Sequence, residues 1–186
     1  HWLFWRYASY WFFSLMFLMG SLSLGHFLLK RFYGPPRKIY EHLTLSFGVG
    51  FFCFELLSYG AGALQLYQFK TFTFFALPAL MIAVGGPSFF HFLSRLRRHR
   101  RRHARRARPL PLWALVVMAF GVLGLLMVYF PVLSPKNAQF DTLWKHLAIA
   151  EDYVASGGLR RFPEGWTPST RPHMTSFLFA WAFLIP

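Results

Sequence analysis

The chain has 186 residues, of which 55% are hydrophobic, 21% aromatic and only 14% charged, and 20 Lys and Arg against 6 Asp and Glu give a net charge of +14. A disordered chain is excluded because disorder requires low hydrophobicity, and an ordinary soluble domain is disfavoured because it carries about 25% charged residues. The single cysteine, Cys53, excludes a disulfide within the chain. Clustered charges between long apolar runs indicate a polytopic membrane protein.

Four apolar runs are long enough to cross the hydrocarbon core of a bilayer as helices, which takes about 20 residues. Three of them contain no charged residue, and the second contains only Glu55. Helix is the spanning structure open to such runs, because the short alternating strands of a membrane barrel are absent. The sequence predicts an all-helical integral membrane protein with complete spans at residues 7–29, 43–69, 71–94 and 110–133.

A new apolar run begins at Met174, and the chain opens with His1 and ends at Pro186. We expect a fragment, or the ordered part of a longer protein, that contains the start of a fifth span. Three regions follow from this reading: a transmembrane region at residues 1–133, a loop at 134–173 and the fifth span from 174 to 186.

Most of the Lys and Arg residues lie in the first and third connections, at residues 30–38 and 95–108. The positive-inside rule places the connections 30–42 and 95–108 in the cytoplasm, and it places the N-terminus and the loop 134–173 outside. We expect the host membrane to be the cytoplasmic membrane of a bacterium.

The Arg run of the third connection could neutralise phosphates, but it has no interleaved aromatic residues on which bases would stack. It therefore indicates no nucleic-acid partner. We expect a topology signal that contacts anionic membrane lipids. The residues expected to do so are Arg97, Arg98, Arg100, Arg101, Arg102, Arg105 and Arg106. The spacing of His99 and His103 suits a metal pair, but the surrounding Arg residues would repel a cation.

The carboxylate and the histidines inside the predicted spans are Glu55, His26 and His91. A carboxylate in the bilayer is costly, so Glu55 either faces a partner, a cavity or a proton path, or is neutral and hydrogen-bonded to a neighbouring helix. His26 and His91 are candidate ligands of a pigment or haem, and the alternative is that each is a packing residue.

Small residues recur at four-residue spacing in the first two spans, which allows helix backbones to approach closely. The pairs are Ser21 with Gly25, Ser46 with Gly50, and Ser58 with Gly62. This pattern predicts helix association.

After the fourth span, apolar residues recur every three or four positions from Ala138 to Ala155, and Gly157 and Gly158 follow. The pattern predicts an external amphipathic helix that lies in the membrane interface. Its polar face carries Asp141 and Lys145 at the spacing of a helical ion pair.

This region also carries a recognisable string. It reads Phe140, Asp141, Thr142, Leu143, Trp144, Lys145, His146, Leu147, Ala148, Ile149 and Ala150, followed by Tyr153, Gly157, Gly158, Leu159, Phe162, Pro163, Arg171 and Pro172 before a new apolar run. The string resembles the first large external loop of GT-C type membrane glycosyltransferases, the superfamily of protein mannosyltransferases and lipid A aminoarabinose transferase.

The resemblance implies transfer of a sugar from a polyprenyl-phosphate carrier to an acceptor on the outer face of the membrane. By position, Asp141 matches the catalytic Asp of the superfamily, as the base or as a carboxylate that faces a divalent cation. The resemblance implies phosphate contact or support of the site for His146, Glu151, Asp152 and Arg171. Family members have many more spans, so we expect the 186 residues by themselves to lack a complete active site.

The alternative is a different class of protein, a non-catalytic subunit that packs through Phe-rich helices against other subunits of a respiratory or photosynthetic complex. In that case lipids or pigments would be the bound groups. A transporter is disfavoured because no inverted repeat or pair of broken helices is present.

Overall fold

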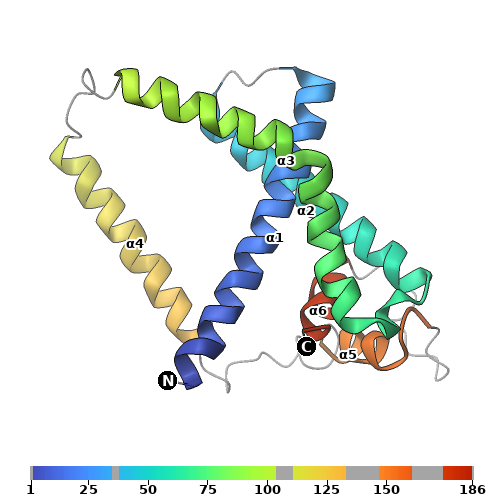
Figure 1. Cartoon of the computed structure of the whole chain (residues 1–186). Helices are drawn as coiled ribbons and strands as arrows, with labels where there is room; N and C mark the ends of the chain where they lie inside the picture. The colour runs from blue at the N-terminus through green and yellow to red at the C-terminus, as the bar shows by residue number, and fades with distance from the viewer. Residues whose placement is uncertain (1, 35–37, 104–110, 133–146, 161–173, 186) are drawn as a thin grey trace.

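The structure is a computed structural model that describes residues 2–34, 38–103, 111–132, 147–160 and 174–185 (Figure 1). In these ranges the regular structure is entirely helical, as predicted. The elements are α1 (Trp2–Tyr33), α2 (Ile39–Ala63), the 3-10 turn η1 (Leu66–Gln68), α3 (Lys70–His103), α4 (Leu112–Val132), α5 (Ala148–Ala155) and α6 (Met174–Phe183).

Three of these helices are long and apolar enough to cross a membrane. The spanning stretches are Ala8–Tyr33 in α1, Ile39–Ala63 in α2 and Lys70–Arg98 in α3. These three apolar helices are compatible with an integral membrane protein. The apolar stretch described in α4, Leu112–Gly124, is shorter than a span, so the fourth complete span stays a prediction.

Two predicted span boundaries were wrong. The second predicted span extends to residue 69, but α2 ends at Ala63, because Gln65 adopts a left-handed conformation with φ 58° and η1 turns the chain toward α3. The predicted connection 95–108 is helical as far as His103, where α3 ends. Arg is a good helix former, so nothing in the Arg run stops α3 where its apolar part ends.

The predicted external helix from Ala138 to Ala155 is described from residue 147 onward, and there α5 covers Ala148–Ala155. Residues 138–146, with Asp141 and Lys145, lie outside the described ranges.

The first helix packs against both α2 and α3, and small residues allow the close approach. A Cβ atom added to Gly25 of α1 would lie 1.8 Å from the carbonyl oxygen of Ser46, and a Cβ atom added to Gly50 of α2 would lie 1.8 Å from that of Ser21. The two predicted pairs thus face each other reciprocally across one helix crossing. On the other side of α1, a Cβ atom on Gly85 would lie 2.2 Å from the Ser23 backbone.

The third small-residue pair also lies at a contact, although not between two long helices. The carbonyl oxygen of Gly62 accepts a hydrogen bond from the Leu159 amide at 2.9 Å, and a Cβ atom on Gly158 would lie 2.5 Å from that oxygen. The segment after α5 therefore rests directly on the end of α2.

The third helix bends visibly, and both Pro78 and Pro87 lie inside it (Figure 1). Proline has no amide hydrogen, so Pro78 leaves the Phe74 carbonyl without its usual partner four residues ahead. The indole Nε1 of Trp181 in α6 donates a hydrogen bond to this carbonyl at 2.9 Å. The Trp181 ring also stacks on the Phe74 ring with centroids 4.7 Å apart.

The bundle has two different ends. The C-terminal part of α3, the end of α1 and the start of α2 lie at one end, whereas η1, α5 and α6 lie at the other (Figure 1). The first end is called the basic end below, after its exposed Lys and Arg residues. The main hydrophobic cluster, with Phe54, Tyr67, Phe74 and Trp181, includes residues of α5 and α6.

Candidate functional site

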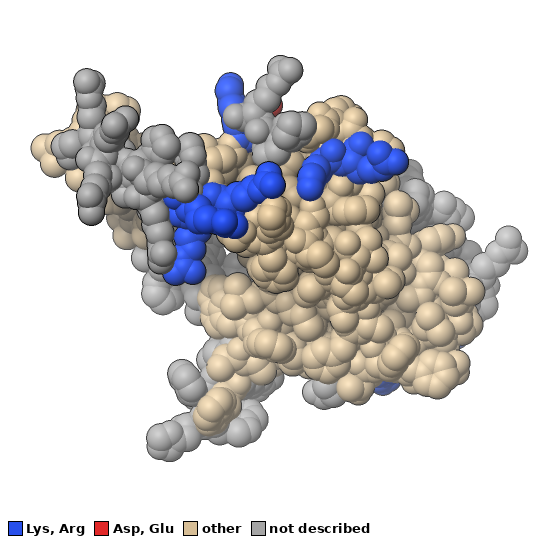
Figure 2. All heavy atoms as spheres, turned by 45° about the horizontal axis from the view of Figure 1, so that its top comes forward, with Lys and Arg blue, Asp and Glu red and all other residues tan. Residues whose placement is uncertain are grey.

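The basic end carries most of the described positive charge. Figure 2 shows Lys and Arg gathered along one side of the face it displays, with uncharged residues over most of the remainder. The exposed residues in this group are Lys30, Arg31, Lys38, Arg95, Arg97 and Arg98. Residues of both predicted basic connections therefore lie at the same end of the bundle, as expected from the prediction that both connections lie on one side of the membrane.

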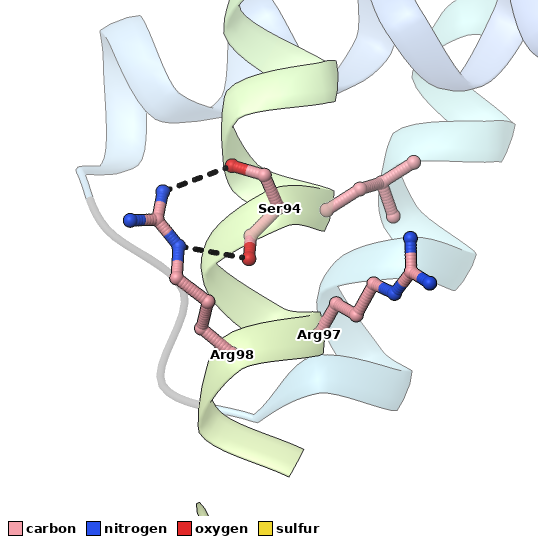
Figure 3. Close-up of a pocket in the computed structure, with 4 residues that line it drawn as sticks. Ser94, Arg97 and Arg98 are labelled. Carbon is pink, nitrogen blue, oxygen red and sulfur yellow. Dashed lines mark hydrogen bonds between the residues drawn. The ribbon is translucent and has the colours of Figure 1, made fainter. Parts of the chain in front are cut away.

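The C-terminal part of α3 forms a shallow cavity of about 470 Å³ lined by Leu93, Ser94, Arg97 and Arg98 (Figure 3). Arg98 folds back along the helix and donates to the Ser94 carbonyl oxygen at 3.4 Å and to the Ser94 hydroxyl at 3.5 Å. The Arg97 side chain points away from Ser94. Two guanidinium groups therefore line this cavity. That of Arg98 is hydrogen-bonded to Ser94 of the same helix, whereas that of Arg97 makes no hydrogen bond to Ser94.

A second cavity, of about 300 Å³, lies between α1 and α3. Phe27, Lys30 and Arg31 line it from α1, and Ser88 lines it from α3. The Lys30 ammonium donates to the Ser88 hydroxyl at 3.4 Å. This contact is long and exposed, so most of the hydrogen-bonding capacity of the ammonium stays open to solvent or a ligand.

Beneath this surface, His26 and His42 form a buried pair. The His26 Nδ1 and His42 Nε2 atoms are 2.8 Å apart, so one imidazole donates and the other accepts. Phe92 stacks on His26 with ring centroids 4.9 Å apart. The contact engages one nitrogen of each imidazole, and the buried Nε2 atom of His26 has no hydrogen-bond partner among the described residues. The described residues contain no group of three metal-ligating side chains, and the role of His26 as a pigment or haem ligand stays a prediction.

His42 is a residue that sequence reasoning missed. It was assigned to the end of a cytoplasmic connection, whereas α2 already begins at Ile39. Its spacing to Ser46 and Gly50 places it on the same face as the small residues. That periodicity is the sequence signal that could have found it. His91, the other predicted ligand, is exposed on α3.

The buried face of α2 also carries Glu55, which is 1% exposed. Neither carboxylate oxygen has a hydrogen-bond partner among the described residues. The second alternative, a neutral carboxyl group hydrogen-bonded to a neighbouring helix, therefore finds no such hydrogen bond among the described residues. That Glu55 faces a partner, a cavity or a proton path stays a prediction.

Nearer α6, a hydrogen-bonded group joins three elements. The Tyr67 hydroxyl donates to the Ser58 carbonyl oxygen at 2.8 Å, and the Ser58 hydroxyl donates to the Phe177 carbonyl oxygen at 3.2 Å. Burial raises the pKa of Tyr67 to about 12, so its hydroxyl keeps its proton at neutral pH. These contacts position α6 on α2 and η1.

The two carboxylates of α5 differ. Glu151 is exposed, whereas Asp152 accepts a bidentate hydrogen bond from the Arg160 guanidinium, with Nε donating to Oδ2 at 2.8 Å and Nη2 to Oδ1. The hydrogen bond to Asp152 raises the pKa of Arg160. Asp152 is therefore engaged in closing the segment after α5, and the roles expected for Glu151 and Asp152 in a site stay predictions.

The remaining predicted site residues are not brought together in the described part of the chain. Arg100, Arg101 and Arg102 lie within α3, with side chains that are not described. Asp141, His146, Arg171, Arg105 and Arg106 lie outside the described ranges.

Comparison of the chain with protein-family models, with curated proteins and with solved structures gave no match. The assignment of function therefore depends on the residues and contacts of this chain.

Proposed function

We propose that the chain is the N-terminal part of a GT-C type membrane glycosyltransferase, which transfers a sugar from a polyprenyl-phosphate carrier to an acceptor outside the membrane. The observation that carries this proposal is the string from Phe140 to Pro172, in which Asp141 occupies the position of the catalytic carboxylate. The residues that follow the string in the described part of the chain form α6.

The anchoring of the segment after α5 supports the proposal. Both backbone groups of Leu159 are bound, because its amide donates to the Gly62 carbonyl oxygen and its carbonyl oxygen accepts from Gln65 Nε2 at 3.0 Å. A loop that presents a catalytic residue needs such a rigid support, since small displacements of a catalytic group lower the rate strongly. The support lies at the end of the bundle opposite the basic end.

In this reaction Asp141 takes the proton of the acceptor, or it holds a divalent cation against the leaving phosphate. His146, Glu151 and Arg171 contact the phosphate or the groups around it. The basic end faces the cytoplasm by the positive-inside rule, so the loop faces outward in the cytoplasmic membrane of a bacterium. Spans beyond these residues complete the site.

The proposal is tested with the natural protein, purified gently from its membrane. Transfer of a labelled sugar from polyprenyl phosphate is compared for the wild type, Asp141→Asn and Glu41→Gln. We expect Asp141→Asn to lower the transfer rate by at least about 100-fold, because a general base typically contributes that factor to the rate. Glu41→Gln is the control, because it removes an exposed carboxylate at the start of α2, which the proposal does not place in the site, and it should retain activity within several-fold.

Two outcomes would contradict the proposal. Undiminished transfer by Asp141→Asn would remove the catalytic assignment. A mass equal to that of the 186 residues, with stoichiometric partner subunits and no transfer, would identify a subunit of a larger membrane complex.

That second function is favoured by α4. This helix makes no extensive contact with the other described helices, and it stands apart from α2 and α3 (Figure 1). Large apolar side chains along it are exposed, among them Trp113, Val117 and Phe120. Such a helix can pack against other subunits, and co-purification of stoichiometric partners distinguishes this function from the transferase.

A further inference from the structure

The groove between α1 and α3 at the basic end combines an apolar wall with two cations and a hydroxyl group. Lys30 and Arg31 lie three and four residues after Phe27, so each lies beside Phe27 on α1, and all three line the groove. Ser88 faces them from α3, and the Lys30 ammonium reaches it across the groove at 3.4 Å. The side chains of Lys30 and Arg31 are exposed.

Among the described residues, no carboxylate neutralises these two cations. In the described part of the chain, no ion pair joins Lys30 or Arg31 to a carboxylate, and the ion pair that is present joins Asp152 to Arg160 in the segment after α5. The Lys30 ammonium has three donors, of which the Ser88 contact engages one. The Arg31 guanidinium presents a planar fork of donors that matches a phosphate.

The position of the groove indicates what kind of phosphate it takes. Phe27 belongs to the apolar part of α1, and Lys30 and Arg31 follow within one turn at the end of the spanning stretch. A ligand here meets an aromatic wall on the membrane side and donors on the polar side. Lipids have this polarity, whereas a free anion has no group for Phe27 to contact.

We propose that the groove of Phe27, Lys30, Arg31 and Ser88 binds the headgroup phosphate of an anionic membrane phospholipid, with an acyl chain against Phe27. Arg31 holds the phosphate oxygens, Lys30 adds charge, and the Ser88 hydroxyl donates a hydrogen bond. The cavity of Leu93, Ser94 and Arg97 has the same combination of apolar wall, hydroxyl and guanidinium. The site lies at the opposite end of the bundle from the segment after α5, so it is independent of the proposed transferase activity.

The test is lipid binding by the purified full chain in detergent, measured by native mass spectrometry with phosphatidylglycerol, phosphatidylcholine and inorganic phosphate as probes. The double variant Lys30→Gln/Arg31→Gln removes the two cations of the groove. The double variant Lys38→Gln/Arg95→Gln is the matched control, because it removes the same charge from exposed residues that do not line the groove. Ser88→Ala is a third, uncharged change.

We expect the wild type to retain phosphatidylglycerol in preference to phosphatidylcholine. Its affinity for phosphatidylglycerol should fall by about 10-fold or more in Lys30→Gln/Arg31→Gln, which is the loss of about 1.4 kcal/mol, and by less than about 3-fold in the control. Ser88→Ala should weaken binding without a change in net charge. The removed cations are exposed, and an unchanged melting temperature confirms that each variant folds.

Equal losses in both double variants would overturn the proposal, because they would assign the attraction to the general positive charge of the basic end. Equal retention of phosphatidylcholine would overturn it as well. Displacement of the lipid by inorganic phosphate at comparable concentrations would replace a lipid site with a site for a free anion. Loss of lipid binding leaves the transfer assay of Asp141 unaffected, so the two proposals fail separately.

Discussion

Single residues decide how the bent third helix is held in the bundle. Pro78 cannot donate to the Phe74 carbonyl, and Trp181, more than a hundred residues later, donates to it instead. Within a membrane no water is present to donate a hydrogen bond to an unsatisfied carbonyl. A hydrogen bond from another helix therefore stabilises the packing more reliably than apolar contact alone. The indole hydrogen bond thus links α6 to the backbone carbonyl of α3 that Pro78 leaves without its helical donor.

This arrangement predicts coupling between the two residues. Trp181→Phe should lower the free energy of unfolding by about 1 kcal/mol, because the Phe74 carbonyl loses its donor. In a Pro78→Ala background the restored amide at position 78 can bond to that carbonyl, so the same change should cost less. Equal costs in both backgrounds, measured by denaturant unfolding in detergent micelles, would contradict the assigned hydrogen bond.

Tyr67 gives a prediction about pH. Since burial raises the pKa of Tyr67 to about 12, the folded state keeps its proton between about pH 10 and 12, where an unfolded tyrosine loses it. The stabilisation is complete below pH 10 and is lost as the pH rises toward 12, by up to about 1.4 kcal/mol per pH unit. Tyr67→Phe should lack this part of the alkaline decline when unfolding is followed over that pH range. An identical decline in the variant would show that Tyr67 does not cause it.

At the scale of elements, the contact between α1 and α2 depends on the absence of side chains. Apolar burial drives helix association weakly in lipid, so close backbone approach and hydrogen bonds contribute most of the packing. The buried face of α2 is accordingly mostly small or polar, with His42, Ser46, Gly50 and Ser58 beside the buried Phe54, whereas several large apolar residues such as Phe52 face outward.

The two glycines of α2 therefore differ in their tolerance of a methyl group. Gly50→Ala should destabilise the protein by about 1–3 kcal/mol, because its Cβ atom would lie 1.8 Å from the Ser21 carbonyl oxygen and the helices must separate. Gly48→Ala is the matched control two residues away, and no atom lies within 4 Å of its Cβ position. The control should be neutral or stabilising by up to about 1 kcal/mol, since Ala favours helix. Similar unfolding transitions for both variants would contradict the crossing.

Across the whole molecule, the separation of the basic end from η1, α5 and α6 predicts how the protein sits in its membrane. Arg97 lies at the basic end, and Lys70 lies at the start of α3, two residues after the last residue of η1. Both side chains are exposed, so both positions tolerate a reporter.

In a Cys53→Ser background, Lys70→Cys should react with a membrane-impermeant maleimide in intact cells, whereas Arg97→Cys should react only after the membrane is permeabilised. The reason is the positive-inside rule, which retains dense Arg clusters in the cytoplasm. Labelling of Arg97→Cys in intact cells would reverse the orientation. Labelling of both variants from one side would contradict α3 as a complete span.

Much of the helical architecture could be predicted, because hydropathy and small-residue spacing are properties of neighbouring residues. The spanning stretches of α1, α2 and α3, the gathering of basic residues at one end and the use of small residues at helix contacts all follow from such patterns. The ends of the helices were predicted less well from the sequence. The turn at Gln65 and the extension of α3 into the Arg run depend on what the chain packs against after the apolar stretch.

The pairing of individual side chains could not be predicted in the same way. The bond between His26 and His42 and the bond between Trp181 and the Phe74 carbonyl join residues from different helices, so they depend on the rotation and crossing of those helices. Periodicity places each residue on a face of its own helix, but it does not specify which residue of another helix lies opposite. Packing between whole helices selects that partner, because only one relative rotation satisfies the close glycine contacts and the buried hydrogen bonds together.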